Sequence, residues 1–193
     1  PRLYVNGAYR ITGSSDLTLN AWNHLAYVRN GTTGTLYLNG SSVGSWTDNT
    51  DYGTAKPLII GALYNGAASF FDGFLDEIRI SKGVARYTSN FGVPSAEFVG
   101  DTDTVLLLHF NGEDSSNTIT DDSLVKQDIR FSGGETADFI TLADTTDFGG
   151  EIRSIASACV YGNFGAYGDG AGVLMYLISQ NFAYIGLGKD EDN

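Results

Sequence analysis

Cysteine, proline and positive charge are scarce in this chain. Its 193 residues include 1 Cys, 3 Pro and 11 Lys plus Arg, against 23 Asp plus Glu. A single cysteine, Cys159, excludes an intrachain disulfide framework, and its small apolar neighbours in IASACVYG indicate a buried, inert thiol. The formal net charge of -12 argues against a nucleic-acid groove and against binding to an anionic membrane, because both need clustered Lys and Arg.

Helical stripes and long apolar spans are also lacking. No segment of ten or more residues shows convincing 3.6-residue periodicity. Residues 172–188 form the most apolar stretch, but Ser179, Gln180 and Asn181 interrupt it, so we interpret it as two strands joined by a polar turn. No signal peptide is visible, and the chain starts in a strand-like PRLYVNG, so we expect it to be an internal piece of a longer polypeptide.

What the chain does contain is short β-type runs between turns. LYVNG (3–7), LYLNG (36–40) and LHFNG (108–112) all end in Asn-Gly, a pair that tolerates positive φ and closes tight turns. Turn signals recur at roughly 8–12 residues, a spacing typical of sandwiches. We therefore predict an all-β fold: an antiparallel two-sheet β-sandwich of the jelly-roll type, followed by a Gly-rich β segment.

Two predicted strands carry more detailed expectations. The run NHLAYVR (23–29) is apolar at both parities, which indicates a central strand covered on both faces. In FFDGFLDEIRIS, strict alternation places Asp76 on the core face with Ile78, and places Glu77 and Arg79 together on the exposed face.

Three stretches occur in an order that resembles a known family. They are LNAWNHLAYVRNGTTGTLYLNGSSVGS, KPLIIGALYNG and FFDGFLDEIRISKGVARYTSNF. Together they resemble the laminin-G-like / concanavalin A-like lectin superfamily, of the branch found in phage and bacterial surface proteins. The resemblance covers residues 2–98 and implies a jelly roll in which Trp22 and His24 belong to the architecture of a central strand. The tail GNFGAYGDGAGVLMYLISQNFAYIGLGKDEDN also resembles virion structural proteins of marine phages.

The resemblance divides the chain into three parts. Residues 1–98 are expected to form the C-terminal part of a laminin-G-like sandwich, because the family has more strands before its Trp strand than this chain does. The strands of 99–149 either complete that sandwich or open a second such domain, and we favour the second domain. Segment 150–193, rich in Gly and Tyr, is expected to be an oligomerisation region, because it is too short to bury both faces of its strands alone.

The acidic residues do not form an enzyme motif. Hydrolases on the resembled fold carry closely spaced acids in a Glu-x-Asp-x-x-Glu strand. Here the nearest cluster, Asp72, Asp76 and Glu77, has only one Glu. His24 and His109 each lie inside an apolar run with no nucleophile motif nearby. We therefore expect no enzymatic activity.

Loop residues supply the candidate binding sites. The candidate carbohydrate-binding residues are Trp46, Tyr52, Tyr64 and Asn65. The three aromatic rings can stack on sugars, and the Asn65 amide can bind sugar hydroxyl groups. Alternatively, Trp46 covers one end of the core. Many domains of the resembled family bind Ca²⁺, which prefers oxygen ligands, and the candidate ligands are Asp48, Asp51 and Asp103.

These observations favour a non-enzymatic virion structural protein, part of a phage tail fibre or surface appendage, with a lectin-like module contacting host-surface glycans. Its expected partners are further copies of itself in a homotrimer and other virion proteins, without nucleic acid or membrane insertion, and its expected location is the virion surface. The alternative is a bacterial extracellular adhesin, or a carbohydrate-binding accessory module of a secreted enzyme, at the cell surface or secreted.

Overall fold

A computed structural model of the chain describes residues 1–50, 58–62, 70–113 and 118–124 in full, and describes five later strands by their backbone pairing. These parts contain thirteen strands. Among the residues described, no helix is long and apolar enough to cross a membrane. The strands are β1 (Arg2–Val5), β2 (Ala8–Thr12), β3 (Asn23–Asn30), β4 (Thr33–Leu38), β5 (Ser41–Thr47), β6 (Leu58–Ile60), β7 (Gly73–Lys82), β8 (Thr104–Leu108), β9 (Ile129–Gly134), β10 (Ala137–Leu142), β11 (Ile152–Gly162), β12 (Val173–Leu177) and β13 (Ala183–Gly186).

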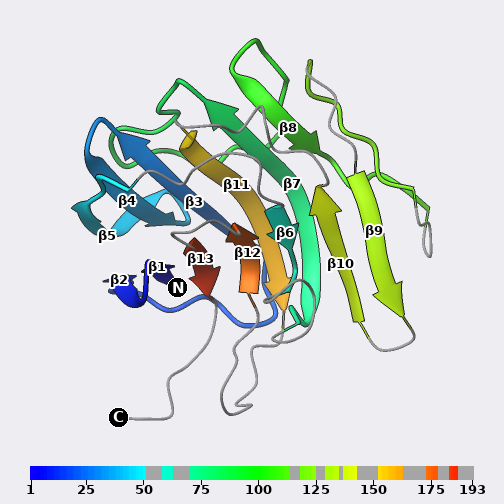
Figure 1. The fold of residues 1–193 in the computed structure, drawn as a ribbon, viewed down its shortest axis with the longest axis horizontal. Coiled ribbons are helices and arrows are strands. Elements are labelled where there is room, and N and C mark those ends of the chain that lie inside the picture. Colours follow the sequence, from blue (N-terminus) through cyan, green and yellow to red (C-terminus); the bar gives the residue numbers. More distant parts are fainter. Residues whose placement is uncertain are drawn as a thin grey trace.

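The strands form two antiparallel sheets, which confirms the predicted sandwich (Figure 1). One sheet has seven strands in the order β2-β1-β13-β12-β6-β10-β9, and the other has six in the order β5-β4-β3-β11-β7-β8. The predicted split of residues 172–188 into two strands is confirmed by β12 and β13. The main core lies between the sheets and takes its buried side chains from both, among them Leu3, Val5, Leu25, Leu36, Ile60, Ile78 and Leu106.

Strands after residue 99 pair with strands before it. β8 pairs with β7, β10 pairs with β6, and β11 lies between β3 and β7. The backbone of Cys159 is part of β11, opposite His24 and Asp76. The division of the chain at 99 and 149 stays a prediction, as does the oligomerisation role of 150–193, although β11 has hydrogen-bonding partners within the chain on both sides.

Asn-Gly pairs close tight turns at two of the three positions where the sequence predicted them. Asn6-Gly7 joins β1 to β2 and Asn39-Gly40 joins β4 to β5, each with positive φ at both residues. The third prediction, for Asn111-Gly112, is wrong: neither residue has positive φ. The Asn111 side chain instead donates a 2.9 Å hydrogen bond to Glu97 Oε1.

Strand β3 is buried on both faces, as its sequence predicted. Leu25 and Tyr27 face the main core, whereas Ala26 and Val28 lie in a second cluster on the outer face of the six-stranded sheet. Residues 83–98 return across this outer face, and their Tyr87 and Phe91 pack on the second cluster. We call residues 83–98 the return segment.

Two contacts hold the return segment in place, one to Asp101 and one to the turn between β4 and β5. Arg86 binds both carboxylate oxygens of Asp101 at 2.6 Å, a bidentate pair. Phe91 N donates to Gly40 O at 2.9 Å. A Cβ at Gly40 would overlap the Phe91 carbonyl, and Gly40 has a φ of 78°, so this close approach requires glycine.

Strand β7 departs from the alternation that its sequence suggested. Glu77 has a φ of 53° and interrupts the pairing of β7 with β11 as a bulge. Leu75, before the bulge, packs against the main core together with Ile78 beyond it, so Asp76 points away from that core. The expected Asp76–Ile78 face is therefore wrong. Glu77 is also buried rather than exposed, because the bulge turns its side chain beneath the end of the return segment.

Candidate functional site

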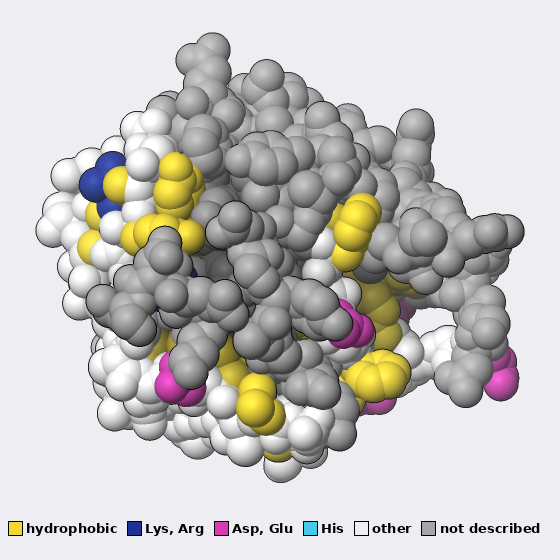
Figure 2. Space-filling model, turned by 90° about the horizontal axis from the view of Figure 1, so that it is seen from below, with side chains coloured by type: hydrophobic (Ala, Val, Ile, Leu, Met, Phe, Trp, Pro, Cys, Tyr) yellow, Lys and Arg dark blue, Asp and Glu magenta, His cyan; other side chains and the backbone are white. Residues whose placement is uncertain are grey.

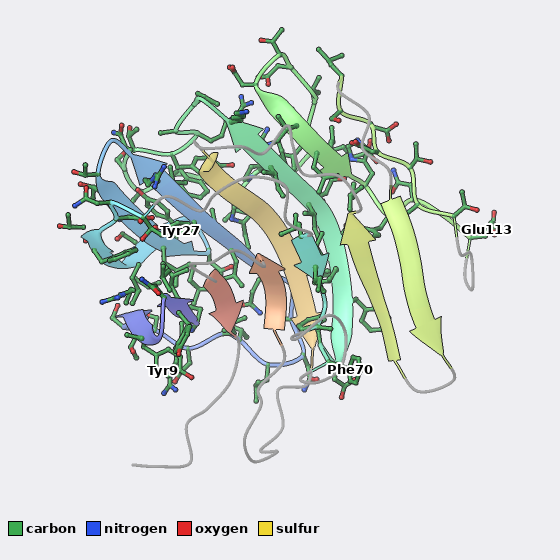
Figure 3. The ribbon with its side chains drawn as sticks, viewed as in Figure 1. Tyr9, Tyr27, Phe70 and Glu113 are labelled. Carbon is green, nitrogen blue, oxygen red and sulfur yellow. The ribbon has the colours of Figure 1, made fainter. Side chains whose placement is uncertain are left out.

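The outer face of the six-stranded sheet carries two exposed aromatic side chains near one end. Trp22 immediately precedes β3 and is 52% exposed, and Phe74 is the second residue of β7 and is 65% exposed. Because side chains alternate along a strand, Trp22 shares the outer face with His24, and Phe74 shares it with Asp76. This is the lower end of β7 and β11 in Figure 1, and Phe70 marks it in Figure 3.

The strand register brings these two residues into line. Asn23 pairs with Val160, which pairs with Leu75, and Tyr161 pairs with Phe74 in the next row. Continuing the β3–β11 register by one residue places Trp22 opposite Tyr161. Trp22 and Phe74 then lie two strands apart, about 10 Å. We call Trp22, the backbone position of Tyr161 and Phe74 the aromatic row.

Carboxylates adjoin the aromatic row. Asp76 lies two residues after Phe74 on the same face of β7, and Asp72 lies two residues before Phe74, immediately ahead of the strand. Desolvation by burial, reinforced by the negative charge of Glu77, raises the pKa of Asp76. Figure 2 views the molecule from this lower side, and it shows hydrophobic side chains with Asp and Glu side chains beside them. The row therefore combines apolar ring surfaces with hydrogen-bond acceptors.

Glu77 is held behind this surface by two partners. Its Oε2 accepts a 2.7 Å hydrogen bond from Phe98 N, and its Oε1 lies 2.6 Å from Nδ1 of His109. The second ring nitrogen of His109 lies 4.0 Å from a carboxylate oxygen of Asp122. The arrangement joins β7, the residue after β8 and the end of the return segment. Arg79, which was expected beside Glu77, lies instead with its guanidinium 4.2 Å from the ring centre of Phe98.

His24 lies next to the aromatic row but inside the protein. It is 2% exposed and contacts the rings of Tyr87, Phe91 and Phe98 edge-on. Burial, with a smaller contribution from the Arg79 charge, lowers the pKa of His24 from 6.5 to about 4. A neutral imidazole packed among rings is a structural residue, as the sequence suggested.

Trp46, the leading candidate from the sequence, packs on the core instead of standing free. Its side chain is partly buried against the main core, and its Nε1 donates a 3.0 Å hydrogen bond to Tyr27 Oη. The guanidinium of Arg10 lies 5.3 Å from its ring centre. The structure thus places Trp46 in the role given by the alternative, that of covering one end of the core.

Two of the three candidate metal ligands, Asp48 and Asp103, lie far apart. Asp48 is 1% exposed, accepting from Tyr27 Oη at 2.7 Å and from Thr50 N at 3.0 Å, with Arg29 3.8 Å away. Asp103 is exposed and precedes β8. β5 and β8 are opposite edges of one sheet, about 24 Å apart across five strand spacings. In the part of the chain that the structure describes, no three His, Cys, Asp or Glu side chains are grouped to hold a metal ion.

Four predicted site residues, Asp51, Tyr52, Tyr64 and Asn65, lie outside the residues described. Sequence reasoning missed Trp22 and Phe74. The signal that could have identified Phe74 is an aromatic residue near the start of a predicted strand, with an Asp two residues before it and another two residues after it. Trp22 was assigned to the architecture because of its place in the family pattern, although the side chain lies just outside the buried run of β3.

Comparison with known proteins bears on the same part of the chain. No curated protein and no solved structure matches it. A family model does match, and the matched segment contains β1 to β7 together with Trp22 and Phe74. Residues 2–86 are thus similar to the concanavalin A-like lectin/glucanases superfamily.

Proposed function

We propose that this protein is a carbohydrate-binding module and that the aromatic row is its binding surface. The observation that carries the proposal is the register that aligns exposed Trp22 and Phe74 on one face of the sheet. Aromatic rings offer flat apolar surfaces to the C–H faces of pyranose rings, while polar groups beside them fix the orientation of the ligand. The similarity of residues 2–86 to a lectin and glucanase superfamily supports the same function.

The module acts by binding and not by hydrolysis. A glycosidase needs one carboxyl group that gives a proton to the leaving oxygen and a second that attacks or activates water. Both oxygens of Glu77 are engaged, one by a backbone N–H and one by His109, beneath the return segment. This leaves Asp76 and Asp72 on the exposed face, where they serve as acceptors for sugar hydroxyl groups.

A glycan array tests the binding surface. The wild-type protein should bind a set of glycans, and Trp22→Ala and Phe74→Ala should each remove most of that binding, because loss of one ring leaves half of the row. Tyr9→Ala is the matched control: Tyr9 is 53% exposed but lies on β2, in the other sheet and well apart from Phe70 (Figure 3). Loss of binding with Tyr9→Ala and not with the row variants would move the site to β2.

The biological setting we propose is a virion surface. Its support is the resemblance of residues 2–98 and of the tail to phage surface and virion proteins. In this setting the chain assembles as a homotrimer with other virion proteins and contacts host-surface glycans. Mass spectrometry of purified virions tests the setting, and light scattering tests the trimer. The alternative is a bacterial adhesin or an accessory module of a secreted enzyme. Finding the chain only in culture medium or at a bacterial surface would favour this alternative.

A further inference from the structure

The ring of Phe74 is bordered by negative charge along its own strand. Asp76 shares the outer face of β7 with Phe74, and Asp72 continues the same alternation one residue before the strand begins, so each lies two residues, about 7 Å along the backbone, from Phe74. The negative groups continue beyond Asp76: Glu97 lies near enough to raise its pKa electrostatically, and Asp122 lies next to His109. Both Glu97 and Asp122 are exposed.

Positive charge is placed elsewhere in the described chain. The segment FFDGFLDEI (70–78) has no Lys or Arg. Arg79 lies over the ring of Phe98, and Arg86 is paired with Asp101. Other arginines are similarly engaged: Arg2 lies over Tyr9 and Arg10 over Trp46. His109, the residue after β8, lies against Glu77.

We propose that the aromatic row accepts uncharged or amino-bearing glycans and excludes glycans with carboxylate or sulfate groups. The inference rests on the proposed function and specifies its ligand class. An acid group on a sugar stacked at Phe74 would lie within about one Debye length of Asp72 and Asp76, so repulsion acts on the bound state. An amino group at the same place would be attracted. Charge complementarity therefore selects among glycans that fit the rings equally well.

The same array decides between the two proposals if it contains matched pairs that differ only in the acid group. The wild-type protein should bind neutral members, and their acid-bearing partners should bind at least about tenfold more weakly at low ionic strength. Asp72→Asn/Asp76→Asn should reduce that difference to threefold or less. A matched control, Asp103→Asn/Glu113→Gln, makes the same charge change on exposed residues away from the row and should leave the difference unchanged (Figure 3).

Each failure has its own signature. If no glycan binds, or if binding survives Trp22→Ala and Phe74→Ala, the proposed function is wrong and this inference falls with it. If glycans bind through the row but acid-bearing partners bind as well as neutral ones, only the charge selection is overturned. A control double variant that relaxes discrimination as much as Asp72→Asn/Asp76→Asn would also overturn it, because the effect would then come from net charge.

Discussion

Glu77 Oε1 lies 2.6 Å from His109 Nδ1, and the opposite oxygen of the same carboxylate accepts a hydrogen bond from Phe98 N. One buried side chain thus links β7 to the residue after β8 and to the end of the return segment. The positive φ of Glu77 makes this possible, because the bulge turns the side chain toward both partners.

Glu77→Ala should destabilise the protein by about 2–3 kcal/mol, because it leaves the Phe98 N–H and the His109 ring without their partner in a buried site. Glu77→Gln keeps an acceptor for Phe98 N and should cost about 1 kcal/mol. Ala and Gln have the same backbone strain at this position, so the difference between their free energies of unfolding reports the hydrogen bonds of the side chain. Urea denaturation midpoints provide the measurement. Equal losses for Ala and Gln would contradict the role given to the Phe98 contact.

A second prediction concerns the stability of the protein when Gly34 is replaced. A Cβ at Gly34 would overlap the hydroxyl of Tyr27, which bridges Trp46 Nε1 and Asp48 Oδ2. Gly34→Ala should therefore cost on the order of 2–3 kcal/mol by displacing this buried network. Gly92→Ala is the control, because a Cβ there meets nothing within 4 Å. Thermal melting of both variants checks this, and a Gly34→Ala protein as stable as Gly92→Ala would count against the network.

Stability should fall on acidification because of His24. The folded protein holds the pKa of His24 at about 4, whereas the unfolded chain takes up the proton near 6.5. Between these values the unfolded state binds more protons, so the free energy of unfolding decreases as pH falls from 6.5 to 4, by an amount on the order of 3 kcal/mol. Above pH 6.5 this contribution is constant.

The comparison variant for that pH effect is His24→Phe, which keeps a ring among Tyr87, Phe91 and Phe98 but cannot titrate. Denaturation midpoints measured from pH 4 to 7.5 should show a shallower slope in the variant, while any binding at the aromatic row is retained. An identical slope in both proteins would mean that other groups govern the acid sensitivity.

Much of the fold follows from local signals in the sequence. The Asn6-Gly7 and Asn39-Gly40 turns and the doubly apolar run of β3 mark real elements, because their cause lies in adjacent residues. Asn111-Gly112 shows the limit: the same dipeptide has no positive φ where the Asn111 side chain binds Glu97. The sheet order could not be predicted either, since the insertion of β11 between β3 and β7 depends on residues at least 70 positions apart.

The site was less predictable than the fold. Trp22 and Trp46 differ in exposure because of what surrounds them in space: Tyr27 and Arg10 contact the side chain of Trp46, whereas Trp22 stays 52% exposed just before β3. The residues next to Trp22 and Trp46 in the sequence do not reveal this difference in exposure. The bulge at Glu77 likewise shifts which side of β7 faces the core, and one such shift moves Asp76 from the expected core face to the outer face.

The chain has only two tryptophans, so fluorescence can report the aromatic row directly. In Trp46→Phe, Trp22 is the sole tryptophan, and titration with a glycan that the protein binds should give a saturable change in emission and protect Trp22 from acrylamide quenching. In Trp22→Phe, the remaining Trp46 should show no change at the same ligand concentrations. A saturable response that follows Trp46, and is absent from the protein that retains Trp22, would contradict the account.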